Sequence, residues 1–76
     1  MEIATIGIGG TIRLGQFLKY ANIAESGAHA KEILEEGLVA VDGQPEKRRG
    51  RQLHGGELVE VGDPVWVRVQ VQLNSC

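Results

Sequence analysis

The chain has 76 residues and a formal net charge of -2, from 8 lysines and arginines and 10 aspartates and glutamates. A chain of this length folds as one domain and has no room for both a hydrophobic core and a buried active site. Its single cysteine, Cys76, rules out an internal disulfide and indicates a reducing compartment, so we expect a cytoplasmic protein.

The first ten residues are mildly apolar and contain three glycines. They predict an extended lead-in, or an edge strand over residues 3–8. A helix is predicted over residues 12–21, with Thr11 as its N-cap and Asn22 as a left-handed stop. Its apolar side chains recur at the spacing of one helical face, at Leu14, Phe17, Leu18 and Ala21.

A second helix is predicted over residues 27–36, where Ser26 is the N-cap and Gly37 follows the last turn. Its apolar face repeats the pattern of the first helix, at Ala30, Ile33 and Leu34. Two short helices with so brief a connection pack as a helix-turn-helix pair, and each must bury its apolar face against something else. The second half of the chain has to supply that surface.

The second half of the chain has a strand-like pattern. An apolar run over residues 38–41 leads into Asp42 and Gly43, a strong hairpin signal, and we expect the basic segment to form the return arm. Further turns are predicted at residues 55–56 and 62–64. The last strand alternates between an apolar face, Val65, Val67, Val69 and Val71, and a polar face, Trp66, Arg68, Gln70 and Gln72. These elements predict an α+β domain with two helices on one side of a small, mainly antiparallel sheet.

Half of all the lysines and arginines lie in one short segment, at Lys47, Arg48, Arg49 and Arg51. An acidic protein is repelled from a polyanion at long range, so this cluster matters only where it docks locally on phosphates or carboxylates. The ordinary explanation of such a run is a solvated turn between strands. The run alone does not decide between these two interpretations.

In order and spacing, the residues from Arg13 to Val61 resemble the RNA-binding domain of the ribosomal protein S-four type, the αL motif. The resemblance is carried by Arg13, Leu14, Phe17, Leu18, Ser26, Gly27, Ala30, Lys31, Ile33, Leu34, Gly37, Val39, Val41, Asp42, Gly43, Leu53, Gly56, Glu57, Val59 and Val61. It implies a two-helix αL motif packed on the sheet, in a single domain over residues 11–72. Residues 1–10 would be the lead-in and residues 73–76 a tail, as in small bacterial proteins made of little besides this domain.

The resemblance also implies a non-enzymatic, ribosome-associated protein that binds structured RNA, either ribosomal or transfer RNA. The two helices and the hairpin would form one RNA-facing surface, and we expect a monomer without cofactors. The RNA-binding residues by position are Arg13, Ser26, Gly27, Lys31, Lys47, Arg48, Arg49 and Arg51. Free backbone N–H groups at the start of the second helix would suit a phosphate, and the arginines would pair with further phosphates or stack on unpaired bases.

Other functions fit the residues less well. The two helices could read DNA, and the valine-rich last strand could act as an open edge in a protein-interaction adaptor. We expect no metal site, since His29, His54 and Cys76 lack the spacing of ligands, and Ser26 is better explained as an N-cap than as a nucleophile. Membrane insertion is not expected either, because cations interrupt the helical candidate before residue 25.

Overall fold

The computed structural model describes residues 3–74, and this part of the chain forms two helices and seven strands. Cys76 lies outside the described residues, as do Met1, Glu2 and Ser75. The elements in chain order are β1 (Ile3–Ile8), β2 (Ile12–Arg13), α1 (Leu14–Tyr20), α2 (Gly27–Glu35), β3 (Val39–Val41), β4 (Gln44–Pro45), β5 (Gln52–Leu53), β6 (Leu58–Gly62) and β7 (Val65–Leu73).

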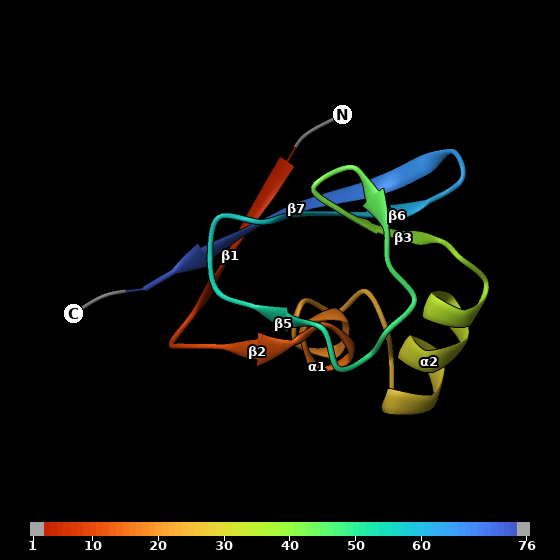
Figure 1. The fold of residues 1–76 in the computed structure, drawn as a ribbon, viewed down its shortest axis with the longest axis horizontal. Helices are drawn as coiled ribbons and strands as arrows, with labels where there is room; N and C mark the ends of the chain where they lie inside the picture. The colour runs from red at the N-terminus through yellow and green to blue at the C-terminus, as the bar shows by residue number, and fades with distance from the viewer. Residues whose placement is uncertain (1–2, 75–76) are drawn as a thin grey trace.

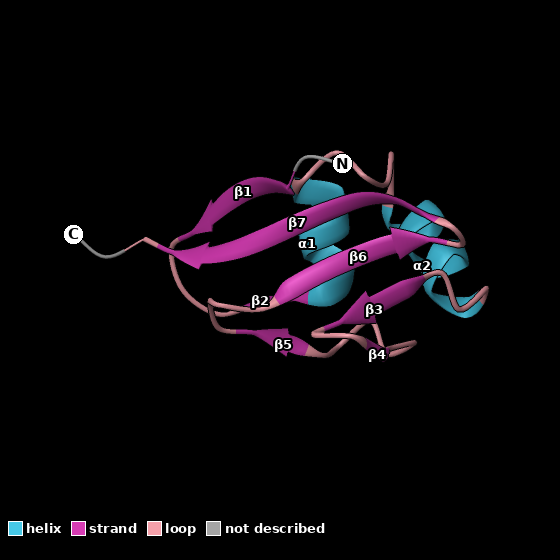
Figure 2. Cartoon of the chain, turned by 90° about the horizontal axis from the view of Figure 1, so that it is seen from above, coloured by secondary structure: helices cyan, strands magenta, loops and turns pink. Residues whose placement is uncertain are grey.

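Five strands form one sheet in the order β1-β7-β6-β3-β4. The pairs β7–β6, β6–β3 and β3–β4 are antiparallel, whereas β1 runs parallel to β7. Both helices lie against the same face of this sheet (Figures 1 and 2). The expected α+β class is therefore confirmed, and the sheet is mainly antiparallel with one parallel pair.

The valine-rich strand β7 lies inside the sheet, between β1 and β6. The alternative in which β7 forms an open edge is wrong, because β1 folds back from the N-terminal end of the chain and pairs with it. The edge strands of the described sheet are β1 and β4. Strand addition to β7, on which the adaptor hypothesis depended, has no free edge there.

The hydrophobic core lies between the two helices and the sheet. It takes the apolar face of each helix and the inward face of the strands, at Leu14, Phe17, Leu18, Ala30, Ile33, Leu34, Val39, Val41, Val59, Val61, Val69 and Val71. The alternation of β7 is confirmed, since Val69 and Val71 are buried whereas Trp66 is 58% exposed on the other face. On this outer face β7 carries the polar side chains Arg68, Gln70 and Gln72 beside Trp66.

Helix α1 begins two residues later than predicted. Ile12 and Arg13 form β2, which pairs with β5, and Arg13 rather than Thr11 is the N-cap. The pairing keeps the backbone of Arg13 extended, with φ -78° and ψ 148°. At the other end, Asn22 has φ 61° and stops the helix as expected.

Helix α2 has nearly the predicted bounds. The Ser26 hydroxyl accepts a hydrogen bond from the His29 N–H at 3.1 Å, which is the geometry of an N-cap. Gly37 has φ 75° and follows the last turn. The sequence therefore predicts this helix well, because its signals are local.

The hairpin turn between β3 and β4 is confirmed, with φ 52° at Asp42 and 82° at Gly43. Its return arm is only β4, however, and the expectation that the basic segment forms this arm is wrong. Residues 46–51, which we call the basic loop, leave the sheet after β4 and cross to α1 before β5 begins. The loop is bonded to the helix by its backbone, as described below.

Replacing Gly43 by Val should lower the free energy of unfolding by about 1–3 kcal/mol, because a β-branched residue is strained at positive φ. Urea denaturation monitored by circular dichroism measures the change. Gly10→Ala is the control, since a Cβ at Gly10 meets no atom within 4 Å and its φ is not left-handed. Equal stability of the two variants would contradict the turn geometry.

Candidate nucleic-acid interface

An open groove of about 490 Å³ lies between α1, the start of α2 and the basic loop. Its charged lining comes from Arg13 and Lys19 of the α1 region and from Arg49 of the basic loop. Gly15, Gly27 and Gly50 also line it, so backbone is accessible on three sides. Of the described residues that line the groove, none is acidic. Two segments distant in sequence, the α1 region and the basic loop, thus bring three cations to one groove.

The helical periodicity of α1 brings polar side chains to the groove at regular intervals. Arg13, Gln16 and Lys19 follow one another at intervals of three and point away from the core face of Leu14 and Phe17. The Gln16 Oε1 atom accepts a hydrogen bond from the Arg13 N–H at 3.3 Å. This contact satisfies one of the free N–H groups at the start of the helix.

The N-terminus of α2 forms the second wall. Gly27 lines the groove, and a Cβ there would meet no atom within 4 Å, so the space above its backbone is open. His29 holds the segment that leads into this helix, because its Nδ1 accepts a hydrogen bond from the Glu25 N–H at 3.0 Å. In the neutral ring the proton is therefore on Nε2. The start of α2 carries a partial positive charge, which adds to the positive charge of the groove cations.

The basic loop is tied to the start of α1 by two backbone hydrogen bonds. The Leu14 N–H donates to the Arg51 carbonyl at 2.7 Å, and the Gly15 N–H donates to the Arg49 carbonyl at 3.0 Å. A Cβ at Gly15 would lie 3.3 Å from the Cβ of Arg49, so glycine permits this close approach. The loop carbonyls thus cap the helix, and the helix fixes the loop.

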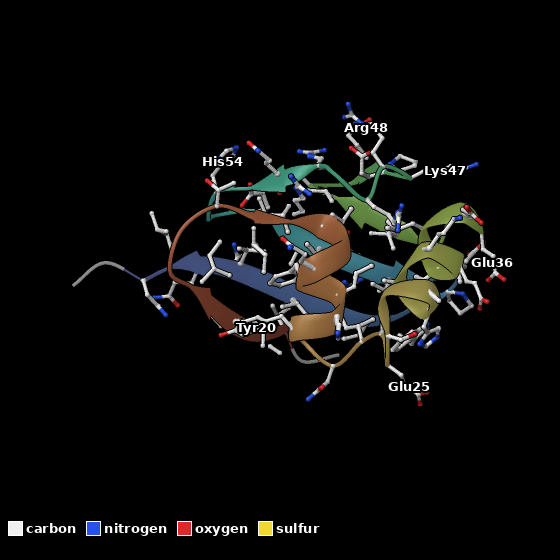
Figure 3. All side chains as sticks on the ribbon, turned by 90° about the horizontal axis from the view of Figure 1, so that it is seen from below. Tyr20, Glu25, Glu36, Lys47, Arg48 and His54 are labelled. Carbon is white, nitrogen blue, oxygen red and sulfur yellow. The ribbon has the colours of Figure 1, made fainter. Side chains whose placement is uncertain are left out.

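A buried carboxylate, Glu46, organises the same loop from the sheet side. The residue is 7% exposed, and its carboxylate accepts four hydrogen bonds from two arginines. Arg48 donates its backbone N–H, its Nε and its Nη2, each at 3.1 Å. Arg51 donates its Nη1 at 3.2 Å. Figure 3 shows Arg48 and Lys47 on the side of the molecule where this loop lies.

These contacts change the acidity of Glu46. The side-chain hydrogen bonds from Arg48 contribute most, the Arg48 N–H and Arg51 add to them, and burial opposes them; together they lower the pKa of Glu46 to about 2. The same pairing raises the pKa of Arg48. Glu46 is therefore a carboxylate at neutral pH, and two of the four cations of the basic segment are partly neutralised by it.

Comparison with known proteins identifies the family. Residues 7–70 match the S4 domain. The chain belongs to the S4 domain family. A relative, described as the probable ribosome maturation protein RlbA of Bacillus subtilis (strain 168), is 50% identical over 50 residues, which cover 66% of this chain and 70% of the relative. The S-four resemblance of the sequence is thereby confirmed.

The structure divides the predicted site residues into three groups. Arg13, Gly27 and Arg49 meet at the groove, and Ser26 caps α2 beside it. Lys31 lies outside the groove lining on the exposed face of α2, with its Nζ 3.8 Å from Glu35 Oε1. The remaining cations, Lys47, Arg48 and Arg51, do not line the groove either, and the last two hold Glu46.

Sequence reasoning missed three contributors. Lys19 and Gln16 line the groove, and the available signal was the regular interval of three residues from Arg13 to Gln16 and from Gln16 to Lys19. Glu46 had no such signal, because its burial depends on how Arg48 and Arg51 fold back on it. In the sequence, a single acidic residue before a basic run has the appearance of an ordinary surface charge, and only the folded loop shows that it is buried.

The described residues bear on two other interpretations. Residues 3–74 contain no group of three or more side chains that could hold a metal ion. In the same part of the chain neither helix has the length and apolar character needed to span a bilayer. His29 accepts a hydrogen bond from the nearby Glu25 N–H, and the Nδ1 atom of His54 lies 3.4 Å from the Thr11 hydroxyl.

The Glu46 cluster predicts a specific loss of stability in acid. Because the pKa of Glu46 is about 2 in the folded protein against 4.5 ordinarily, its stabilisation is complete above the ordinary value and disappears as the pH falls toward the folded one. We expect a contribution of about 1–2 kcal/mol, less than the full shift implies because Arg48 is largely exposed and solvent screens it.

Denaturation curves of the native protein and Glu46→Gln over this pH range measure the contribution. The native protein should be more stable at neutral pH, and the difference should shrink as the pH falls. Other carboxylates titrate in both proteins and cancel. A difference that is independent of pH would contradict the ionic origin of the contact.

Proposed function

We propose that this protein is a non-enzymatic RNA-binding protein that acts on structured ribosomal or transfer RNA during ribosome maturation. The observation that carries the proposal is the convergence of Arg13, Lys19 and Arg49 on one open groove, in a protein of net negative charge. None of the described residues that line this groove is acidic. Membership of the S4 domain family supports it, as does similarity to a probable ribosome maturation protein. We place its action in the cytoplasm, as a monomer.

The groove suits a sugar-phosphate backbone. Its guanidinium and ammonium groups supply charge and hydrogen-bond donors, and the backbone at Gly27 is open to close approach. Folded RNA brings several phosphates close together at bends and junctions, which concentrates charge where a small basic surface can meet it. In this proposal Lys31 and Lys47 extend the surface, and Ser26 orders its edge.

The lining favours binding over chemistry. Among the described residues that line the groove, the side chains offer positive charge and an amide, with no carboxylate, imidazole or thiol. General acid-base or nucleophilic catalysis needs a proton-accepting group or a nucleophile within hydrogen-bond reach of a substrate. The one candidate in the described lining is the amine of Lys19, which is exposed and has no carboxylate or imidazole beside it there. We therefore propose that any catalysis on the bound RNA belongs to a partner.

DNA reading through α2 is the alternative with the weaker support. A recognition helix presents several base-reading side chains to the major groove. The exposed residues of α2 include Lys31 together with Glu32 and Glu35, and the lysine is paired with one of these acids. Duplex DNA is accordingly the comparison ligand in the experiment below.

RNA affinity should fall as salt rises. Neutralisation of about three to five phosphates predicts a slope of about -2 to -4 for log K against log[salt]. Filter binding with ribosomal RNA, transfer RNA and a DNA duplex of similar length measures it. Equal binding of the duplex, or an affinity that does not change with salt, would contradict the proposal.

The groove residues should carry this binding. Lys19→Ala and Arg49→Ala should each weaken RNA binding by about tenfold, because each removes a charge-assisted contact with phosphate. Both residues are exposed, so the melting temperature should change little.

Arg68→Gln is the charge-matched control, since Arg68 is paired with Glu60 at 2.8 Å and alternates with the buried valines of β7. It therefore lies on the sheet face away from the helices. We expect a change below about twofold for this variant. An effect as large as that of Arg49→Ala would show that net charge, and not the groove, determines affinity.

A further inference from the structure

We propose that Glu46 is a positioning residue for RNA binding: it holds the basic loop in the shape that presents Arg49 to the groove. The inference rests on the proposed function and assigns the acid of the basic segment a role in that same site. Glu46 does not line the groove and would not touch RNA there. It acts through the loop.

The first step of the argument is the rigid attachment of Glu46. Its backbone N–H donates to the Val39 carbonyl at 3.0 Å, so the residue continues the hairpin pairing of β3 with β4. Its side chain is 8% exposed and cannot move freely. The carboxylate is therefore a fixed point on the edge of the sheet.

The second step is that this fixed point closes the loop. Arg48 and Arg51 both donate to the Glu46 carboxylate, and the Arg51 N–H also donates to the Arg48 carbonyl at 3.3 Å. Two guanidinium groups brought to one place repel each other without an anion between them. Removal of the carboxylate charge should therefore open the loop between residues 46 and 51.

The third step connects the loop with the groove. In this closed shape the carbonyls of Arg49 and Arg51 accept hydrogen bonds from the N–H groups of Gly15 and Leu14. The same backbone contact places the Cβ of Arg49 against Gly15, at the edge of the groove that the Arg49 side chain lines. Glu46 and Arg49 are thus coupled through two arginines and the first turn of α1.

The cations of the segment divide accordingly. Arg48 and Arg51 hold the loop, whereas Arg49 is the member of the segment that reaches the groove. An anion so close to a phosphate site weakens attraction to RNA by simple electrostatics. If the Glu46 charge is lost, electrostatics alone predicts tighter RNA binding, whereas positioning predicts weaker RNA binding. This difference in sign makes the inference testable.

The experiment compares Glu46→Gln with the native protein in binding ribosomal RNA and transfer RNA. Positioning predicts that the variant binds about fivefold more weakly, although it has gained one unit of positive charge. Glu32→Gln, on the exposed face of α2, removes the same charge elsewhere and should bind as tightly as the native protein or slightly more tightly. Binding by Glu46→Gln that equals or exceeds native binding would overturn the inference.

A double-mutant cycle tests the route through Arg49. In an Arg49→Ala background, Glu46→Gln should cost little further affinity, because the side chain that it positions is gone. Additive losses would overturn the inference. Amide hydrogen exchange gives a readout without RNA: the N–H groups of Leu14 and Gly15 should exchange faster in Glu46→Gln while those of the core strands do not.

Two outcomes separate this inference from the proposed function. A native protein that binds neither RNA refutes the proposed function, and with it the role of Glu46 in binding. A native protein that binds, together with a Glu46→Gln variant that binds equally well, refutes the inference alone. Should Glu46→Gln fail to fold, Glu46→Asp keeps the charge on a shorter side chain and should still lose affinity, and native affinity in that variant would overturn the inference.

Discussion

Two backbone hydrogen bonds, from the first amides of α1 to the carbonyls of Arg49 and Arg51, connect the fold of this domain with its surface. A seven-residue helix is too short to be stable alone, and its first N–H groups need partners. The chain provides carbonyls from a loop that is itself rich in arginine. The same two hydrogen bonds therefore cap the helix and place the cations of the loop beside it.

The same contact between α1 and the basic loop also affects where the cations of the molecule lie. The protein as a whole is acidic, so its attraction for a polyanion must come from a local field. Three cations from the α1 region and the basic loop share one groove, whereas two arginines are held by Glu46 and one lysine lies beside Glu35. Charges that are exposed and fixed in one hollow act together on a phosphate. Charges already paired contribute to shape more than to attraction.

The elements that could be predicted from the sequence are those with local causes. The N-cap at Ser26, the left-handed stop at Asn22, the glycine after α2 and the turn at Asp42 and Gly43 each depend on a few adjacent residues. The valine alternation of β7 likewise gives its buried face directly. These signals were enough to establish the α+β class and to suggest the family.

The elements that could not be predicted depend on partners far along the chain. Residue 12 is a strand because it pairs with Leu53, and β7 is internal because residues near the N-terminus return to lie beside it. The site shows the same limit. Arg49 and Arg51 look alike in the sequence, and only the folded loop shows that one lines the groove while the other faces Glu46.

This arrangement explains how so small a domain can carry a binding surface at all. The core uses one face of each helix and one face of the sheet, so the long cationic side chains of the groove lie outside it and can vary without creating cavities. Glu46 and Gly15 are exceptions among the residues around the surface, since one is buried under its arginines and the other is in close backbone contact with the loop. We therefore expect the domain to tolerate substitution less well at Glu46 and Gly15, which shape the groove, than at the cations that line it.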